Sequence, residues 1–455
     1  MRHLVSAARE HATPGGVMVQ SHSPQKPGPT PRQVAAIVAG NSLEFYDFLT
    51  YSFFAVQIGK TFFPSDHPGA SLLASLATFG AGFATRPVGA FVIGRLADRV
   101  GRKPAMLLSF GLMGLAIFGL ALTPAFSVIG VAAPILVIGF RLIQGFALGG
   151  EVGPSTAFLI ESAPPHRRGA YVSLQYMGQD AAVLAAGLMG VWLSNLLGPA
   201  ALTAYGWRIA FLVGAVIVPF GLILRRGLAE TLHEPEPAPA VHPGVPRPYL
   251  RIAVLGLMML SAGTIVSYVL NYMTTYATAT LKMPSTVAFG ATVAGGIVGV
   301  LFDPIGGWLS DRFGRKPVMI IPWVALLVLV GPCFFVISHY HTAAALWGAT
   351  ALMSVASAIA GSSVLIAITE SLPKRIRSGS LALIYAFAIS VFGGTAQFNV
   401  TWLTQVTNNP LAPAGYMVLA VAVGLVAMIA MRETAPVRLA RTRAPSTLLA
   451  DAPGA

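Results

Sequence analysis

The sequence predicts an all-α membrane protein with twelve transmembrane helices, arranged as two six-helix halves that are related by pseudo-two-fold symmetry. Three observations predict this fold class. Of the 455 residues, 55% are hydrophobic and only 10% are charged, whereas a soluble domain carries about 25% charged residues. Apolar runs of about 20 residues, the length that crosses a bilayer as a helix, recur along the chain. Two short motifs occur once in each half, which indicates an internal repeat.

The apolar runs fall into two groups of six. The first group predicts helices near residues 34–58, 70–93, 105–123, 131–160, 170–195 and 208–224. The second group predicts helices near residues 252–279, 286–308, 318–338, 343–369, 379–404 and 412–431. Residues 225–251 lie between the groups and are rich in proline and charge, so they are predicted to form a cytoplasmic linker.

The predicted domains follow from these runs. The linker joins an N-terminal half at 34–224 to a C-terminal half at 252–431. Residues 1–33 are polar, rich in proline and glycine, and lack the apolar core of a signal peptide, so we expect a disordered cytoplasmic tail. Residues 432–455 are expected to form a second cytoplasmic tail.

The internal repeat involves two loops of each half. GRLADRVGRKP at 94–104 returns as GWLSDRFGRKP at 307–317, and ESAPPHRRG at 161–169 returns as ESLPKRIRSG at 370–379. These copies follow the second and the fourth predicted helix of their halves. Transporters built from two parallel halves hold their substrate between the halves, near the bilayer midplane.

The basic residues are distributed unevenly between the two sides of the membrane. With the N-terminus inside, most of the 29 Lys and Arg residues fall on the cytoplasmic side, and only Lys60, Arg208 and Lys282 fall outside. This bias is a topology signal, and it predicts a multi-pass protein of the cell (inner) membrane with both termini in the cytoplasm. The net charge of +13 is thereby explained without a nucleic-acid partner.

The first predicted helix, which contains GNSLEFYDFLTYSFFA at 40–55, carries two acids in its middle. Each charged residue at a helix centre costs ~2.5–3.5 kcal/mol, so Glu44 and Asp47 are candidates for a function. Asn41, Glu44, Asp47 and Tyr51 stand on or near one helix face, which suits the wall of an aqueous cavity. The alternative is that the acids only pair with arginines and hold helices together.

Other polar residues fall inside predicted helices of the first half. Arg86 and Arg141 are the cationic partners available to the two acids, and Arg86 precedes Pro87, which favours a kink. Gln175 and Gln179 are neutral groups suited to orienting a ligand, and Glu151 shares a face with Gln144. Asp180 remains ambiguous, because its side chain could equally point towards another helix.

The second half has fewer buried charges. Asp303, which precedes Pro304, is its clear intramembrane acid, and it could instead brace the nearby GGWLSDR turn. Candidate ligand contacts are Tyr268, Asn271, Tyr272 and Thr275, spaced i, i+3, i+4, i+7 on one helix, and Gln397 and Asn399 on another.

Several of these motifs resemble known transporters. G-x-x-x-D-R-x-G-R-K at 94–103, its second-half copy, and R-x-x-Q-G at 141–145 resemble the major facilitator superfamily. GNSLEFYDF, FGAGFATRPVGAFVIGRLADRVGRKP (79–104) and RLIQGFALGGEVG (141–153) resemble its metabolite:proton symporter family. SLQYMGQDA at 173–181 is most similar to the citrate and tricarballylate branch of that family.

The resemblance implies a secondary transporter, not an enzyme, that imports a small organic acid with protons by alternating access. The substrate would be a tricarboxylate such as citrate, or a dicarboxylate; no cofactor, metal or obligate protein partner is expected. The arginine of R-x-x-Q-G is expected to face the first-helix acid, so Arg141 should pair with Asp47. An anion that competes for Arg141 would promote protonation of Asp47, and the proton would in turn favour the anion.

These considerations assign three sets of residues. The expected proton-coupling residues are Asp47, Glu44 and Arg141. The expected substrate contacts are Arg86, Arg141, Asn41, Tyr51, Gln144, Gln175, Gln179, Tyr268, Asn271, Tyr272 and Asn399. The expected gating residues are Gly94, Asp98, Arg99, Gly101, Arg102, Glu151, Glu161, Asp311, Arg312, Gly314, Arg315 and Glu370, whose charges would form ion pairs in one conformation and lose them in the other.

Alternative functions remain open at this point. One is proton symport of 2-oxoglutarate, shikimate or a zwitterionic osmolyte such as proline or betaine. Another is a non-transporting receptor, although no soluble signalling domain is visible. The intramembrane acids outnumber Arg86 and Arg141, so charge counting alone does not select an anion, and that choice rests on the resemblance.

Overall fold

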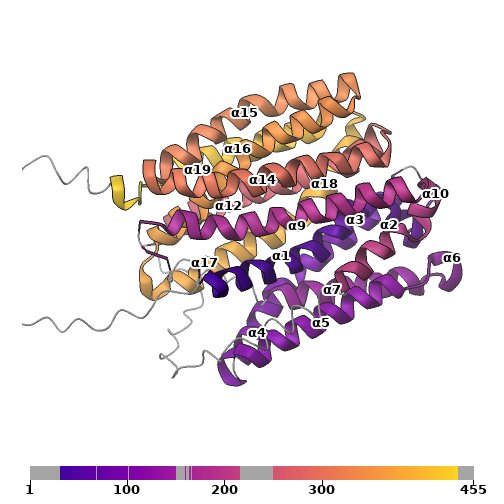
Figure 1. The fold of residues 1–455 in the computed structure, drawn as a ribbon, viewed down its shortest axis with the longest axis horizontal. Helices are drawn as coiled ribbons and strands as arrows, with labels where there is room; N and C mark the ends of the chain where they lie inside the picture. Colours follow the sequence, from indigo (N-terminus) through magenta and orange to yellow (C-terminus); the bar gives the residue numbers. More distant parts are fainter. Residues whose placement is uncertain are drawn as a thin grey trace, which may run out of the picture.

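The structure is a computed structural model. It describes residues 31–215 and 249–438, apart from 68, 101, 150–158, 160–162 and 165. Some helical residues are described without their side chains, namely 31–33, 36–37, 44, 97–98, 102–103, 106, 374–379 and 382. The predicted tails and the predicted linker lie largely outside the described residues. In the part of the chain that is described, helices pack side by side with their axes roughly parallel (Figure 1).

The helices of the first half precede residue 216. They are α1 (Pro31–Phe53), α2 (Ala55–Phe62), α3 (Ala70–Ala84), α4 (Arg86–Val100), α5 (Arg102–Leu122), α6 (Phe126–Ile129), α7 (Ala132–Gly149), α9 (Arg168–Leu196), α10 (Pro199–Ala201) and the π-helical η1 (Leu202–Gly206). Residues 207–215 are also helical.

The second half begins at residue 250. Its helices are α12 (Leu250–Asn271), α13 (Met273–Thr275), the π-helical η3 (Tyr276–Thr280), α14 (Ser285–Phe313), α15 (Arg315–Tyr340), α16 (Ala343–Ser371), α17 (Lys374–Ala388), the π-helical η4 (Ile389–Gly393), α18 (Gly394–Thr407) and α19 (Ala412–Ala430). Figure 1 shows the start of α1 and the described end of the chain at the same, left-hand end of the bundle.

The predicted apolar runs agree with these helices wherever the residues are described. Eight of the described helical segments are long and apolar enough to cross a membrane. The helices α1 and α9 are long enough, at 23 and 29 residues, but their polar residues lower the mean hydropathy and they are not among the eight. The count of twelve spans therefore stays a prediction.

The two halves meet along α9 and α14, which lie beside each other (Figure 1). Glycines allow the close approach. A Cβ atom on Gly296 would lie 2.6 Å from the backbone nitrogen of Leu184, and one on Gly307 would lie 2.5 Å from the carbonyl oxygen of Gly169. Because both contacts join backbone to backbone, no side-chain movement would relieve a larger residue here.

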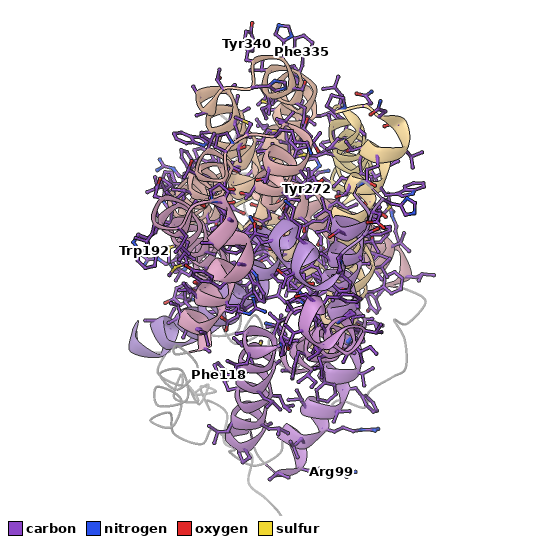
Figure 2. All side chains as sticks on the ribbon, turned by 90° about the vertical axis from the view of Figure 1, so that its right-hand side faces the viewer. Arg99, Phe118, Trp192, Tyr272, Phe335 and Tyr340 are labelled. Atoms are coloured by element: carbon purple, nitrogen blue, oxygen red, sulfur yellow. The ribbon has the colours of Figure 1, made fainter. Side chains whose placement is uncertain are left out.

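The outer surface is apolar, as a lipid-facing surface must be. Figure 2 labels Trp192, Phe118 and Phe335 at the edge of the molecule and Tyr272 near its middle. The exposed fractions agree, because Trp192 and Phe335 are 54% and 55% exposed whereas Tyr272 is 1% exposed. The described helices therefore present the surface of a multi-pass membrane protein.

The break that was predicted at Arg86-Pro87 is present. Helix α3 ends at Ala84 and α4 begins at Arg86, with Thr85 between them in a turn. Pro87 has no N–H to donate to the carbonyl of Phe83, so the regular ladder cannot continue through this point. The break directs the Arg86 side chain into the interior, where it is 7% exposed.

Candidate functional site

A cavity of about 160 Å³, lined by apolar side chains and a smaller number of polar ones, lies between the two halves. Each water molecule needs roughly 10–15 Å³ of such space, so the cavity can hold several waters or a small solute. Helices α1, α4 and α9 line it from the first half, and α12, α14, α15, α16 and α17 from the second. Its charged and longer polar lining residues are Arg86, Tyr176, Gln179, Asp180, Tyr268, Asn271, Asp303 and Tyr385.

Arg86 supplies the cation on the cavity wall. Its guanidinium carbon lies 4.4 Å from the ring centroid of Phe48 and 4.2 Å from that of Phe83. The same group interacts with the hydroxyl groups of Tyr268 and Tyr385. Its Nε and Nη2 atoms are buried without a hydrogen-bond partner, so N–H donors remain available.

Arg141 lies behind Arg86 and is fully buried. It donates a hydrogen bond to Oε1 of Gln144. Its guanidinium carbon lies 4.6 Å from the ring centroid of Phe48 and 4.5 Å from that of Tyr51. Phe48 therefore contacts both guanidinium groups, and the two like charges are near enough to disfavour each other.

Glycines on α7 allow this arginine cluster to form. A Cβ atom on Gly145 would overlap the carbonyl oxygen of Gly82, and one on Gly149 would overlap that of Arg86. Helix α7 thus crosses α3 and α4 in backbone contact, which brings Arg141 beside Arg86. Small residues at such crossings allow two helix backbones to approach closely.

The expected ion pair between Asp47 and Arg141 is not formed. Asp47 is 3% exposed and lies against Gly214, where an added Cβ atom would overlap the carboxylate. Its Oδ1 atom has no hydrogen-bond partner. Neighbouring residues on a helix differ by about 100° in direction, so when Phe48 faces the arginines, Asp47 must face another helix. The side chain of Glu44 is not among those described.

A second pair of acids meets across the two halves. Asp303 of α14 is 2% exposed, and its carboxyl group lies close enough to that of Asp180 of α9 for the two acids to interact. Asp180 itself packs on Gly299, where an added Cβ atom would overlap Oδ2. Asp180 thus points towards another helix, and Asp303 faces Asp180 instead of bracing the GGWLSDR turn.

The other predicted ligand contacts divide into two groups. Gln179, Tyr268 and Asn271 line the cavity, whereas Tyr51 and Gln144 contact Arg141 behind it. The amide of Asn41 donates to the carbonyl oxygen of Gln175 at 3.5 Å, so these two residues connect α1 to α9.

Tyr272 and Asn399 are not on the cavity wall. The hydroxyl of Tyr272 accepts a hydrogen bond from Thr401 at 2.8 Å, and the amide of Asn399 donates to Tyr416 at 3.3 Å. Both contacts lie within the second half. Tyr176 and Tyr385 line the cavity instead, and sequence reasoning missed them because no neighbouring charge or repeated motif singled them out.

An ionic network joins the halves where α9 begins. The carboxylate of Asp311 accepts hydrogen bonds from the backbone N–H groups of Gly169 and Ala170, at 2.9 and 3.0 Å. Arg315 contacts Asp311 at 2.7 Å and Glu370 at 3.3 Å. Glu370 also pairs with Arg168 of the first half at 3.5 Å. We call these residues the α9 network: Arg168, Gly169, Ala170, Asp311, Arg315 and Glu370.

The predicted gating residues are thus brought together only in part. Asp311, Arg315 and Glu370 belong to the α9 network, whereas Arg312 lies over the rings of Trp308 and Phe313. Gly314 has a φ of +105°, which a side chain would strain. Gly94 and Arg99 lie in α4 outside this network. Gly101, Glu151 and Glu161, and the side chains of Asp98 and Arg102, lie outside the described part.

The halves also touch on the other side of the cavity, one helical turn beyond Phe48. The hydroxyl of Ser52 donates to Oε1 of Gln397 at 2.7 Å, and the hydroxyl of Thr275 donates to the carbonyl oxygen of Ser52 at 3.3 Å. A Cβ atom on Gly80 would lie 2.5 Å from the carbonyl oxygen of Gly394. The cavity therefore lies between two sets of contacts that join the halves.

Comparison with known proteins places this arrangement in a family. The sequence profile of the Major Facilitator Superfamily matches residues 39–396. The citrate-proton symporter of Klebsiella pneumoniae is 33% identical over 417 residues, covering 90% of this chain and 94% of that protein. The alpha-ketoglutarate permease of Escherichia coli is 35% identical over 382 residues, covering 81% and 87%.

A further relative and a solved structure are also similar to this chain. The proline/betaine transporter of Escherichia coli is 31% identical over 422 residues, covering 89% of this chain and 84% of that protein. Among solved structures, the D-xylose-proton symporter superposes with a TM-score of 0.72 at 18% identity, covering 89% of this chain and 98% of that one.

Proposed function

The chain belongs to the major facilitator superfamily, and from this premise we propose that it imports a small organic acid together with protons. The substrate is a tricarboxylate such as citrate, or a dicarboxylate. We further propose twelve transmembrane helices in two halves of six, with the N-terminus, the linker and the C-terminus in the cytoplasm. The described helices and the repeated loops support this organisation.

The observation that carries the proposal is the pair of buried arginines. Arg86 and Arg141 both contact Phe48, and no described carboxylate lies within salt-bridge distance of either. Buried cations without a counter-charge are costly, and guanidinium groups match carboxylates in shape and charge. A substrate with two or three carboxylates would supply the missing charge.

The acidic residues near the site do not cancel its preference for an anionic substrate. Asp47 faces Gly214, away from the arginines, and Asp180 and Asp303 interact with each other. The acid pair lines the same cavity as Arg86, but no described acid forms an ion pair with the guanidinium group. What remains at Arg86 is net positive among the described side chains, and this supports an anionic substrate.

Proton coupling is assigned to Asp47, with Glu44 and Arg141 as its partners. In the closed conformation Asp47 is buried away from Arg141, and a protonated carboxyl is the form that tolerates such a place. When the helices shift and Asp47 meets Arg141 or water, the charged form is favoured and the proton leaves. The α9 network is the proposed cytoplasmic gate, which must separate for release.

Uptake into sealed proteoliposomes tests the function. With an inward proton gradient, we expect accumulation of tri- or dicarboxylates, alkalinisation of the outside, and loss of both with an uncoupler. Asp47→Asn should keep substrate exchange but lose gradient-driven accumulation, and the surface variant Asp66→Asn should behave like wild type. If no organic acid accumulates, the proposal fails; if Asp47→Asn accumulates normally, coupling resides elsewhere.

The same uptake experiment distinguishes a tricarboxylate from a second candidate substrate. The identity to the alpha-ketoglutarate permease favours a dicarboxylate that would use the same two arginines. A panel of tri-, di- and monocarboxylates, with proline and betaine added, ranks these substrates by competition. Preference for a zwitterion would contradict the anion site.

A further inference from the structure

The acid pair between the halves is not used by the coupling mechanism above. Asp180 belongs to α9 of the first half and Asp303 to α14 of the second, and both line the cavity. The carboxylate of Asp180 lies against Gly299, which is one helical turn before Asp303 on the same face of α14, so the two carboxyl groups face each other. A hydrogen bond between two carboxyl groups needs one proton, because carboxylate oxygens without a proton can only accept.

Among the described residues, no cation forms an ion pair with either acid. Oδ2 of Asp303 is buried without a hydrogen-bond partner. The other titratable or charged side chains on the cavity wall are Arg86, Tyr176, Tyr268 and Tyr385. The guanidinium of Arg86 lies over the rings of Phe48 and Phe83 and forms no ion pair with either acid. Helix α16 contributes hydroxyl groups but no charge.

We propose that Asp180 and Asp303 bind one proton between them, and that this shared proton is required for the two halves to close around the substrate. Two ionised carboxylates at hydrogen-bond distance repel each other. Since Gly299 lets the backbone of α14 approach Asp180, loss of the proton would push α9 and α14 apart at this point. The proton, bonded to one carboxyl oxygen, thus joins the halves through an O–H···O hydrogen bond.

The position of the pair makes it suited to coupling. It lies on the same cavity as Arg86, so a solute that enters the cavity changes the hydration of both. Its proton would be bound when the halves close and released when they part, in addition to the proton on Asp47. This transport role rests on the proposed function, whereas the shared proton does not.

Infrared spectroscopy of the purified full-length protein tests the shared proton directly. At neutral pH, the difference spectrum of wild type minus Asp303→Asn should contain the carbonyl band of one protonated carboxyl group. The difference for Asp66→Asn, an exposed acid, should contain only carboxylate bands. Asp303→Glu, which keeps an acid, should retain the protonated band. Carboxylate bands alone in the Asp303→Asn difference would overturn the proposal.

Transport by the double variant Asp180→Asn/Asp303→Asn tests the role in closure. The two amides keep a hydrogen bond but cannot ionise, so substrate exchange should continue. Accumulation driven by a proton gradient should fall at least tenfold, and the protons moved per substrate should fall by one. Unchanged accumulation and stoichiometry would overturn the role. If wild type shows the infrared band but transports no acid, the proposed function fails and the proton pair stands.

Discussion

The carboxylate of Asp311 accepts a hydrogen bond from the backbone N–H of Gly169 at 2.9 Å, so an acid of the second half caps a helix of the first. Orphan N–H groups at a helix start favour a negative charge. Because Arg315 holds the same carboxylate at 2.7 Å, the cap is fixed in direction. The closed state at this end of the molecule therefore depends on a contact between the two halves. This contact can open while each half stays folded.

Replacing Asp311 with alanine should weaken this closed end. Loss of a charged cap costs on the order of 1–3 kcal/mol, which corresponds to a change of about tenfold or more in the open population. In a Cys333→Ala background, a cysteine placed at the buried Ser173 should react with a maleimide several-fold faster. Asp66→Asn should leave the rate unchanged, and an unaltered rate in Asp311→Ala would contradict a gating role.

Removing one cavity arginine should weaken anion binding. Arg86→Gln removes a cation that lies over Phe48 and Phe83, so calorimetry should show at least a tenfold rise in the Kd for citrate or a dicarboxylate. Arg141→Lys should also weaken binding, because an ammonium group does not reproduce the planar stacking on Phe48 and Tyr51. The control is Arg95→Gln, an exposed arginine on the same helix; equal losses in both would refute a specific site.

Gly145 sets the distance between α7 and α3. An alanine there would place its Cβ atom onto the carbonyl oxygen of Gly82, and such overpacking costs about 1–3 kcal/mol. We expect Gly145→Ala to lower the Tm and weaken substrate binding, since the shift displaces Arg141. Gly139→Ala is the matched control, because no atom lies within 4 Å of an added Cβ atom. Equal Tm values for the two variants would contradict this contact.

The ionised carboxylate of Glu433 should stabilise the folded protein, and acid should remove this stabilisation by protonating it. Burial alone would raise its pKa, but backbone N–H groups of Ala435, Lys316, Arg315 and Thr434 donate to the carboxylate and lower the pKa below the ordinary 4.5. A depressed pKa stabilises the folded state above the unfolded pKa, and this stabilisation is lost as the pH falls through the folded value.

Glu433→Gln should therefore lower the Tm at neutral pH, and the difference from wild type should shrink below pH 4.5. Differential scanning fluorimetry in detergent, from neutral pH to below pH 4.5, measures this difference in Tm. Asp66→Asn, at an exposed acid that no described helix end uses, should show no such pH-dependent difference. A difference for Glu433→Gln that persists at acid pH would refute the assignment to its ionised form.

The positions of the helices could be read from the sequence because each apolar run is bounded by polar or glycine-rich loops. The break before Arg86 was also predictable, since Pro87 removes a donor wherever it lies. The partners Asp311, Arg315 and Glu370 were expected from the repeated loops. Arg168 was missed as a gate, because a basic residue in a cytoplasmic loop is already explained by topology.

The expected pairing of Asp47 with Arg141 was wrong for this conformation. A helical pattern gives the angle between residues of one helix, but it does not say which neighbour each face meets. Phe48, not Asp47, faces the arginines because α7 crosses α3 at Gly82 and Gly145. The contact between Asp180 and Asp303 could not be predicted from the sequence either, because the two residues come from different halves.

The amino-acid sequence was enough to predict a helical membrane protein with an internal repeat, its intramembrane charges, and the short repeated loops. These follow from local properties, namely hydrophobicity, helix periodicity and charge placement along the chain. The folded structure was needed to see that Arg86 and Arg141 contact one aromatic ring and that two acids from different halves line one cavity. Those contacts depend on how closely separate helices cross, and glycines far apart in the sequence jointly set that distance.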